Sequence, residues 1–221
     1  MKYALVTGAN SDVGKSICEK LLEQNYEVIA CCHLSASNLN DLNVTIKYCD
    51  LNDEEQIKNL VKNYNLSVLV NAAAYSCDDL IENKTSEEFL NCFKINTLAP
   101  FLLIKYANIK DYIINISSSD SIDTYNEYNY DYAASKAALN NLTKSLSLVT
   151  KAKIVALAPN WINTKNIEKI DQEYLKEDML KHHQEKLVTL DDIKNYIGKI
   201  LNDEYQTGSI IRIDGVNEDV Y

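Results

Sequence analysis

A tyrosine and a lysine four residues apart give the strongest chemical signal in the sequence. Tyr132 and Lys136 belong to the stretch YAASK, and their spacing places both side chains on one face of a helix. A phenol has a pKa near 10, and a neighbouring ammonium favours the phenolate, so the pair predicts a tyrosine that exchanges a proton near neutral pH. Serines 117–119 stand 13 to 15 residues earlier, where a hydroxyl can hydrogen-bond a substrate oxygen.

A second signal is the stretch TGANSDVG, residues 7–14, which lies between an apolar run and a helical pattern. Gly8 is expected to make a tight turn, and Gly14 to let helix and strand pack closely. The helix N-terminus then offers free N–H groups and a partial positive charge to a pyrophosphate. The stretch therefore predicts a phosphate cradle, with the unusual feature that Asp12 stands where such cradles usually carry a glycine.

Asp12 has two possible effects on this cradle. A carboxylate about 6 Å from a phosphate would repel it by about 2.8 kcal/mol at an effective dielectric of 20, which is roughly a hundredfold in affinity. Alternatively, the carboxylate caps the helix by accepting from the N–H of Gly14 or Lys15, contributing about 1 kcal/mol. We favour the cap, and expect a weakened but working cofactor site.

Apolar runs and helical patterns alternate along the whole chain, and these elements must position the reactive side chains. Thr85 and Glu88 form a capping box that opens a long helix through about residue 107, which Pro100 should kink or restart. The expected strands are 3–8, 27–32, 44–51, 67–74, 111–119, 152–159 and 209–214, and the other helices are 13–24, about 57–64, 131–149, 171–186 and 191–202.

This order predicts an α/β fold, in which residues 1–221 form one doubly wound Rossmann-type domain. About seven parallel strands are expected, with helices on both faces and ligands at the carboxyl ends of the strands.

Composition narrows the function classes. The 221 residues are 46% hydrophobic and carry a net charge of −10, which argues against nucleic acid and anionic membranes as partners. The start of the chain lacks a signal peptide, and no apolar run is long enough to span a bilayer, so we expect a cytoplasmic protein. The six cysteines are expected to be reduced and mostly buried. The adjacent CCH at 31–33 points to opposite strand faces, so no metal site is expected.

Taken together, the motifs resemble the short-chain dehydrogenase/reductase family over essentially the whole chain. TGANSDVG resembles its T-G-x-x-x-G-x-G turn, CDLND the acid-containing segment after strand three, NAAA its N-N-A-G motif, and APNWINT its P-G-x-x-x-T motif. NISS and YAASK match its catalytic strand and helix, INTLAPF its helix asparagine, and TGSIIRIDG its C-terminal strand. The sequence departs from the pattern at three glycine positions, now Asp12, Ala74 and Asn160.

The resemblance implies an NAD(P)(H)-dependent oxidoreductase that moves a hydride between nicotinamide and a carbonyl or secondary alcohol. In it, Tyr132 is the acid/base, Lys136 lowers its pKa and binds the nicotinamide ribose, and Ser118, with Ser119 as the fallback, polarises the carbonyl. Asn96 supports a water-linked proton path to Lys136. The implied cofactor-binding residues are Gly8, Asn10, Ser11, Asp12, Val13, Gly14, His33, Asp50 (facing the adenine), Leu51, Asn71, Ala72, Ala73, Tyr132, Lys136, Pro159, Trp161, Ile162 and Thr164.

The cofactor type depends on the end of the second strand. An acid there grips the ribose hydroxyls of NAD, but the position is Cys31, and no arginine for a 2′-phosphate is present nearby. His33, Ser11 and Lys15 could together accept a 2′-phosphate, so NADP(H) is favoured over NAD(H).

The substrate is expected to be a small carbonyl or alcohol compound. The family position of the substrate loop is about 163–186. The tyrosines and amides of residues 120–131 suit a polar, sugar-like compound. The resemblance also implies a homodimer or homotetramer.

Three alternatives stay open at this point. One is a nucleotide-binding protein of this family type without turnover. Another is a 3-oxoacyl-carrier-protein reductase, against which stand the absence of an apolar trough and the acidity of the chain. The third is a nucleotide-sugar-modifying enzyme, which can share Y-x-x-x-K but which the spacing after Gly8 and the short C-terminal part disfavour.

Overall fold

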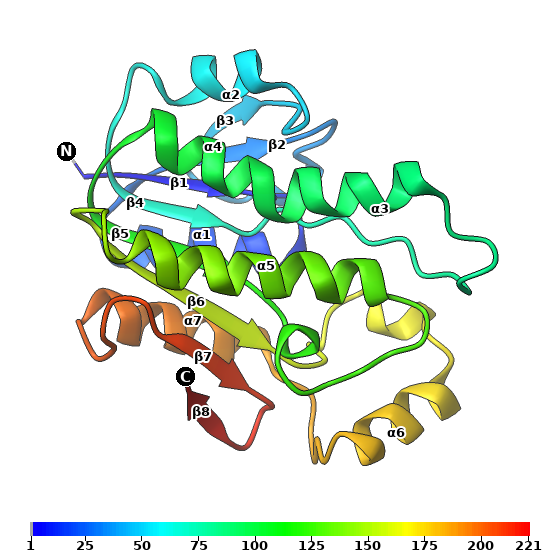
Figure 1. The fold of residues 1–221 in the computed structure, drawn as a ribbon. Coiled ribbons are helices and arrows are strands. Elements are labelled where there is room, and N and C mark those ends of the chain that lie inside the picture. The colour runs from blue at the N-terminus through cyan, green and yellow to red at the C-terminus, as the bar shows by residue number, and fades with distance from the viewer. Residues whose placement is uncertain (1) are drawn as a thin grey trace.

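The computed structural model describes residues 2–221, which contain one eight-stranded sheet in the order β3-β2-β1-β4-β5-β6-β7-β8 (Figure 1). Strands β1 to β7 are parallel, whereas β8 runs antiparallel to β7. The predicted parallel sheet is thus confirmed, and β8, which follows a turn at Gly215, was not predicted. The strands are β1 Tyr3–Thr7, β2 Glu27–Cys32, β3 Thr45–Tyr48, β4 Asn65–Asn71, β5 Asn108–Ile116, β6 Lys153–Pro159, β7 Ile210–Ile213 and β8 Glu218–Val220.

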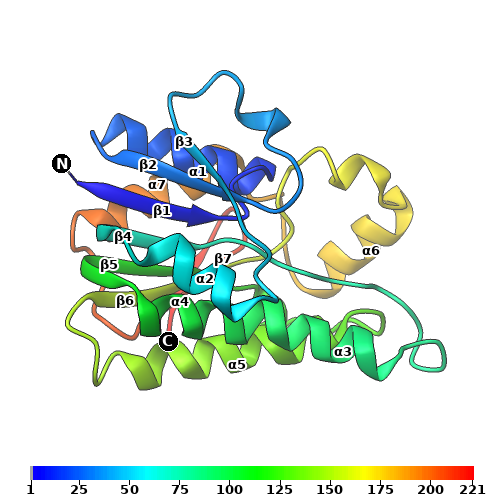
Figure 2. The same ribbon diagram turned by 90° about the horizontal axis from the view of Figure 1, so that it is seen from above.

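Helices cover both faces of this sheet (Figure 2). One face carries α1 and α7, which pack against each other over a buried apolar cluster of β1, β2 and β4 side chains. The other face carries α2 to α5 (Figure 2), of which α2 and α4 contribute side chains to a second buried apolar cluster. The helices are α1 Asp12–Glu23, α2 Glu54–Val61, α3 Ser86–Phe93, α4 Ala99–Tyr106, α5 Tyr130–Leu146, α6 Gln172–Lys181 and α7 Leu190–Leu201. This two-sided covering confirms the doubly wound arrangement and explains why the central strands are apolar throughout.

Local sequence signals account for most helix ends. The Thr85 hydroxyl accepts the N–H of Glu88, whose carboxylate accepts back from Thr85, so the capping box is confirmed. The long helix predicted there is interrupted by a π-helical turn, η2 Lys94–Leu98, just before Pro100. The helix expected to reach residue 186 ends at Lys181, because His183 adopts a left-handed backbone with φ +54°.

The carboxyl ends of the parallel strands face the segment between β6 and α7, which contains α6 and projects beyond the sheet (Figure 2). Three short 3₁₀ turns also lie in strand-end connections: η1 Ser37–Leu39, η3 Ser119–Ser121 and η4 Ile167–Lys169. All six cysteines are free, and five of them are buried. Over residues 2–221 no helix combines the length and apolar character needed to cross a bilayer, and no cluster of metal-ligating side chains is found.

Candidate active site

A large cleft runs along the carboxyl ends of β1, β2, β4, β5 and β6. Its volume is about 1330 Å³, more than the roughly 300–1,000 Å³ of ordinary ligand pockets, so a dinucleotide and a small substrate fit together. The predicted cofactor residues that line it are Gly8, Asn10, Ser11, Asp12, Val13, His33, Asp50, Leu51, Ala72, Ala73, Tyr132, Lys136, Pro159, Trp161, Ile162 and Thr164. Gly14, Asn71 and Asn96 are not among the lining residues.

Gly8 and Gly14 shape the turn between β1 and α1. Gly8 has a positive φ of +64°, which favours glycine. A side chain on Gly14 would bring its Cβ to 2.2 Å from the Gly8 carbonyl oxygen. The close approach of helix and strand expected at Gly14 is therefore confirmed. The residues at the start of α1, Ser11, Asp12 and Val13, line the same cleft, so the turn fits a pyrophosphate at a helix N-terminus.

The helix cap is Ser11, so the prediction that Asp12 caps α1 is wrong. The Ser11 hydroxyl accepts the N–H of Gly14 at 2.9 Å and donates to the Gly8 carbonyl at 2.9 Å. Asp12 is already the first helical residue, so its carboxylate is free to bind elsewhere. It accepts the backbone N–H of Lys165 at 2.8 Å and the Asn38 amide at 3.3 Å. The Lys165 ammonium lies 3.6 Å away.

The other two glycine departures are mild. Among residues 2–221 the non-glycine residues with a positive φ are Asn25, His183 and Asp203. Ala74 and Asn160 therefore occupy backbone conformations that any residue adopts, as expected for a mild change.

The adenosine end of the cleft contains thiols where an NAD-binding acid is absent. Cys31 and Cys49 line the cleft, and a hydrogen bond between their thiols, together with burial, raises the pKa of Cys31. His33 and Ser11 line the cleft as expected. Lys15 does not, because its ammonium is bound to Asp41 at 2.7 and 2.8 Å. The three-residue 2′-phosphate site predicted from the sequence therefore retains two members in the cleft.

At the opposite end, Tyr132, Lys136 and Ser118 face the cleft together. The Lys136 ammonium donates to the Ile116 carbonyl at 2.7 Å and lies 5.5 Å from the centre of the Tyr132 ring. A hydrogen bond joins the Ser118 hydroxyl to the Tyr132 phenol. Ser119 is buried against the Thr124 hydroxyl and does not line the cleft, so the first-choice serine is the one beside Tyr132.

Burial dominates the proton affinities at this end. It lowers the pKa of Lys136 to about 8. It raises the pKa of Tyr132, with a further rise from the Asp120 and Asp78 carboxylates, while the Ser118 hydrogen bond opposes the rise. In the protein chain alone the net effect is thus a raised pKa of Tyr132, because desolvation disfavours the phenolate; the lowering of that pKa by Lys136 stays a prediction.

Asn96 lies behind the cleft wall, in the π-helical turn η2. Its carbonyl accepts the N–H of Tyr75 at 2.8 Å, and its amide donates to the Tyr75 carbonyl and the Ser135 hydroxyl, both at 2.9 Å. The side chain thus ties the segment after β4 to the helix that carries Tyr132. Its part in a proton path to Lys136 stays a prediction. Asn71 is likewise buried, and its amide donates to Asn115 at 2.8 Å.

Comparison with known proteins identifies the family. The family model for short chain dehydrogenases matches residues 2–175. The chain belongs to the short-chain dehydrogenase family.

Individual relatives of this dehydrogenase support the assignment. A 3-oxoacyl-[acyl-carrier-protein] reductase from Rickettsia prowazekii is 34% identical over 190 residues, 77% of each chain. A solved dehydrogenase/reductase from Sinorhizobium meliloti has the same fold, with a TM-score of 0.88, 23% identity, and 97% of this chain and 94% of that chain covered. A metagenomic blue fluorescent protein solved with NADPH has a TM-score of 0.86 at 24% identity, covering 97% and 96%. The protein is thus an NAD(P)(H)-dependent oxidoreductase that acts on a CH–OH or C=O group and uses a nicotinamide cofactor.

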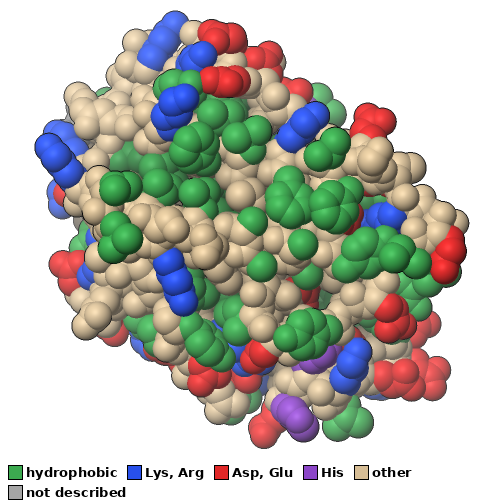
Figure 3. Space-filling model, in the orientation of Figure 1, with side chains coloured by type: hydrophobic (Ala, Val, Ile, Leu, Met, Phe, Trp, Pro, Cys, Tyr) green, Lys and Arg blue, Asp and Glu red, His purple; other side chains and the backbone are tan. Residues whose placement is uncertain are grey.

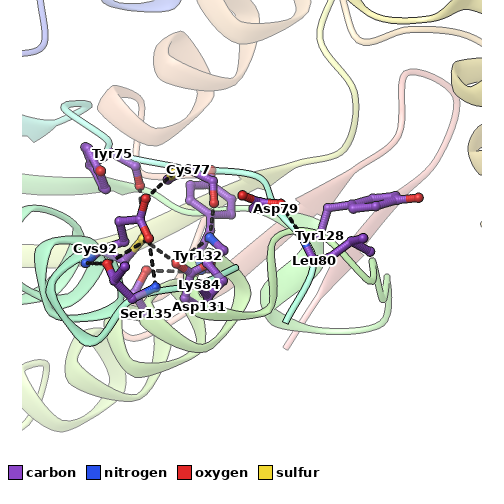
Figure 4. A network of polar contacts seen from close by, with 12 residues as sticks. Tyr75, Cys77, Asp79, Leu80, Lys84, Cys92, Tyr128, Asp131, Tyr132 and Ser135 are labelled. Atoms are coloured by element: carbon purple, nitrogen blue, oxygen red, sulfur yellow. Dashed lines mark hydrogen bonds and ion pairs between the residues drawn. The ribbon is translucent and has the colours of Figure 1, made fainter. Parts of the chain in front are cut away.

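Sequence reasoning missed a buried ion pair beside Tyr132 in this dehydrogenase (Figure 4). Lys84 and Asp131 lie 2.7 Å apart, with side chains that are 5% and 0% exposed. Asp131 accepts the N–H of Tyr132 at 2.9 Å, and Lys84 also donates to the Cys77 carbonyl. The pair therefore fastens the segment after β4 to the start of α5. An acid in the first helical turn, directly before Tyr132, was the one signal for it.

Three polar residues at the substrate end were also not identified as site residues. Asp120, Asn129 and Asn160 line the cleft beside Tyr132. Asp120 and Asn129 fall within the polar segment 120–131 that the sequence marked only as a whole, and Asn160 was noted only as a lost glycine. Their spacing in sequence gives no sign that they meet, because they come from two separate strand-end connections.

Proposed function

We propose that this dehydrogenase transfers a hydride between NADP(H) and a small polar carbonyl or secondary alcohol, with Tyr132 as the acid/base. The observation that carries the proposal is the meeting of three groups at one end of the cleft: the Tyr132 phenol, the Ser118 hydroxyl bonded to it, and the Lys136 ammonium. Asn96 assists by holding the backbone at Tyr75.

The side chains divide the work of carbonyl reduction. The bound nicotinamide supplies the hydride in this direction and accepts it in the reverse. Ser118 donates a hydrogen bond to the carbonyl oxygen, which gains negative charge as the carbonyl carbon is reduced. Tyr132 gives its proton to that oxygen, forming the alcohol and a phenolate. Lys136 stabilises the phenolate through its charge, and its ammonium would also bind the nicotinamide ribose.

The pKa directions agree with this division. Because burial raises the pKa of Tyr132, the phenol is protonated and ready to donate before reduction begins. The lowered pKa of Lys136, about 8, leaves the amine mostly protonated at pH 7. Replacing Tyr132 by phenylalanine tests the assignment: loss of turnover with cofactor binding retained supports it, and unchanged turnover contradicts it.

The preference for NADP(H) rests on the adenosine end of the cleft. Cys31 stands where NAD-binding proteins of this fold carry an acid, so no carboxylate there repels a 2′-phosphate. His33 and Ser11 are available to bind one. Titration with NADPH and NADH, followed by nicotinamide fluorescence, should give tighter binding of NADPH; equal or tighter binding of NADH would overturn the preference.

Reduction of a 3-oxoacyl group is the second candidate, because the relative from Rickettsia prowazekii is named for it. Oxidation of NADPH by acetoacetyl-coenzyme A tests this candidate directly. Rapid turnover of that thioester, and slow turnover of small polar carbonyls, would move it ahead.

A homodimer or homotetramer in the cytoplasm completes the proposal. Hydrophobic side chains gather on the face formed by α3 to α5 (Figure 3), where Phe89, Leu90 and Leu98 are exposed. Such a patch suits contact with a second copy. The six free cysteines suit a reducing compartment. Light scattering during gel filtration measures the assembly, and a monomeric mass would contradict it.

A further inference from the structure

The end of the cleft beside Tyr132 is lined by side chains with unused hydrogen-bonding capacity. Asp120 follows the Ser118 turn, Asn129 directly precedes α5, and Asn160 follows β6. All three line the cleft together with Ser118 and Tyr132. The Asp120 carboxylate acts on the pKa of Tyr132 and accepts the Asn129 amide, so these two lie at the Tyr132 end, and Asn160 lines the same cleft from the end of β6.

Asp120 supplies the acceptors at this end. Its two carboxylate oxygens accept from the Thr124 hydroxyl at 2.6 Å and the Asn129 amide at 3.0 Å. Each carboxylate oxygen can accept more than one hydrogen bond, so both keep capacity for a ligand. Burial raises the pKa of Asp120. A further donor from a ligand would offset part of the cost of burying this carboxylate.

Asn129 and Asn160 each leave one amide atom without a partner, and their other bonds fix which atom it is. The Asn129 amide nitrogen donates to Asp120, so the buried oxygen Oδ1 is the acceptor left over. The Asn160 oxygen accepts the N–H of Trp161 at 2.9 Å, so the buried nitrogen Nδ2 is the donor left over. Asn160 is only 7% exposed, and its Nδ2 has no partner among residues 2–221.

We propose that this end of the cleft selects a polyhydroxylated carbonyl or alcohol of the sugar or polyol class, with Asp120, Asn129 and Asn160 as specificity-determining residues. Each hydroxyl of such a compound donates one hydrogen bond and accepts others. Donation to Asp120 or Asn129 Oδ1, and acceptance from Asn160 Nδ2, would satisfy all three side chains. The inference rests on the proposed function, because it names the substrate class of that same site.

An apolar substrate is disfavoured by the same groups. An acyl or aryl chain placed here would leave two buried amide atoms, Asn129 Oδ1 and Asn160 Nδ2, without a partner, and would add no donor to the Asp120 carboxylate. Sites built to hydrogen-bond a substrate hydroxyl reject the analogue lacking it by up to about 10⁴–10⁵-fold. An ammonium in place of a hydroxyl is disfavoured at Asn160, because an ammonium cannot accept a hydrogen bond from Asn160 Nδ2.

The test uses pairs of alcohols that share a carbon skeleton and differ in the number of hydroxyls. The pairs are myo-inositol with cyclohexanol, D-sorbitol with hexan-2-ol, and D-xylose with tetrahydropyran-2-ol, oxidised with whichever nicotinamide binds tighter. We expect at least one polyol to exceed its partner in kcat/KM by about 100-fold or more. Preference for the plain alcohols, for trans-2-aminocyclohexanol or for acetoacetyl-coenzyme A in the reverse direction overturns the inference and leaves the proposed function standing.

Two variants show whether the named side chains set this preference. Asp120→Asn removes the charge at constant size, and Asn160→Ala removes the free donor. Each should reduce the polyol-to-alcohol ratio of kcat/KM by about tenfold or more, whereas the exposed Glu127→Gln in the same segment should leave it unchanged. A loss that is equal for both members of a pair would show a merely structural role. If the protein binds a nicotinamide cofactor but oxidises none of these alcohols, the inference fails. If the protein binds neither NADPH nor NADH, the proposed function fails as well.

Discussion

The two ends of the cleft are built differently. At the end that contains Tyr132 and Lys136, functional side chains are buried and held by protein partners: the Lys136 ammonium by the Ile116 carbonyl, and the start of the Tyr132 helix by the Lys84–Asp131 pair. Outside the lining of the adenosine end, the charged groups Lys15 and Asp41 meet at the surface, and Asp41 is exposed. Proton transfer requires fixed distances, whereas charge recognition at the cofactor's far end tolerates movement.

This contrast teaches where substitutions should matter. When one atom of a buried group is removed, no water or neighbouring side chain can replace it. Changes at Tyr132 and its neighbours should therefore abolish proton transfer. An exposed charge is screened by water and salt and is replaceable by neighbours. Changes at the adenosine end should therefore shift affinity by small factors. The following substitutions test the contrast, beginning with the largest expected effect.

Removal of the Tyr132 hydroxyl should have the largest effect. Tyr132→Phe keeps the ring against Lys136 but deletes the proton donor, so kcat should fall by about 10²–10⁴-fold. Cofactor affinity, measured by nicotinamide fluorescence, should change by less than about twofold, because the ring itself remains. Tyr130→Phe in the same helix is the matched control and should retain activity. Equal activity of Tyr132→Phe and wild type would remove Tyr132 from the mechanism.

Replacement of Lys136 should lower activity and raise stability together. Burial lowers its pKa from 10.5 to about 8, so below pH 8 the folded state carries a penalty of about 3 kcal/mol. Between pH 8 and 10.5 the unfolded chain binds more protons than the folded chain, so this penalty fades as pH rises. Lys136→Met should therefore raise the free energy of unfolding at pH 7 by about 2 kcal/mol, after subtracting about 1 for the lost hydrogen bond to Ile116.

Urea unfolding at pH 7 and pH 10 measures this effect. The gain from Lys136→Met should shrink at the higher pH, and Lys144→Met, an exposed change on the same helix, should give no comparable gain. Destabilisation of Lys136→Met at both values would show that Lys136 contributes more through its bond to Ile116 than burial costs.

Release of Lys15 should change cofactor choice by a smaller factor. Asp41→Asn removes the carboxylate that binds the Lys15 ammonium. Free Lys15 should then tighten NADPH by about threefold, with NADH unchanged, because only NADPH carries the 2′-phosphate. Fluorescence titration at low salt provides the measurement. The double variant that adds Lys15→Met should cancel the gain; an unchanged NADPH affinity would exclude Lys15 from phosphate binding.

Asp12 should have the smallest effect of the four. Its carboxylate is held by the Lys165 N–H and lies 3.6 Å from the Lys165 ammonium, so its charge is largely offset. Asp12→Asn should change cofactor affinity by less than about threefold, against roughly a hundredfold if the charge opposed the phosphate directly. Lys165→Met should expose the repulsion and weaken binding. A large gain in affinity from Asp12→Asn alone would show that the offset fails.

Much of the fold could be predicted from the sequence because the signals were local. The capping box at Thr85 depends on residues three apart, and the alternation of apolar runs depends on neighbours within each strand. The strand β8 was missed because its three residues are all exposed and carry no apolar pattern. The cap of α1 was misassigned because serine and aspartate are both favoured at the N-cap position. Only the backbone conformation shows that Ser11 is the extended residue before the helix and that Asp12 is already helical.

The sequence by itself determined the family, the order of strands and helices along the chain, and the placement of Tyr132 and Lys136 on one helix face. It could do so because periodicity and motif spacing depend on residues that are close together in the sequence. Only the tertiary structure decided that Asp12 binds Lys165, that Asp131 pairs with Lys84, and that Asp120, Asn129 and Asn160 line the same cleft as Tyr132. These partners are separated along the chain and come together only where strand ends converge. Their side chains are polar, and polar contacts between distant segments leave no periodic trace in the sequence.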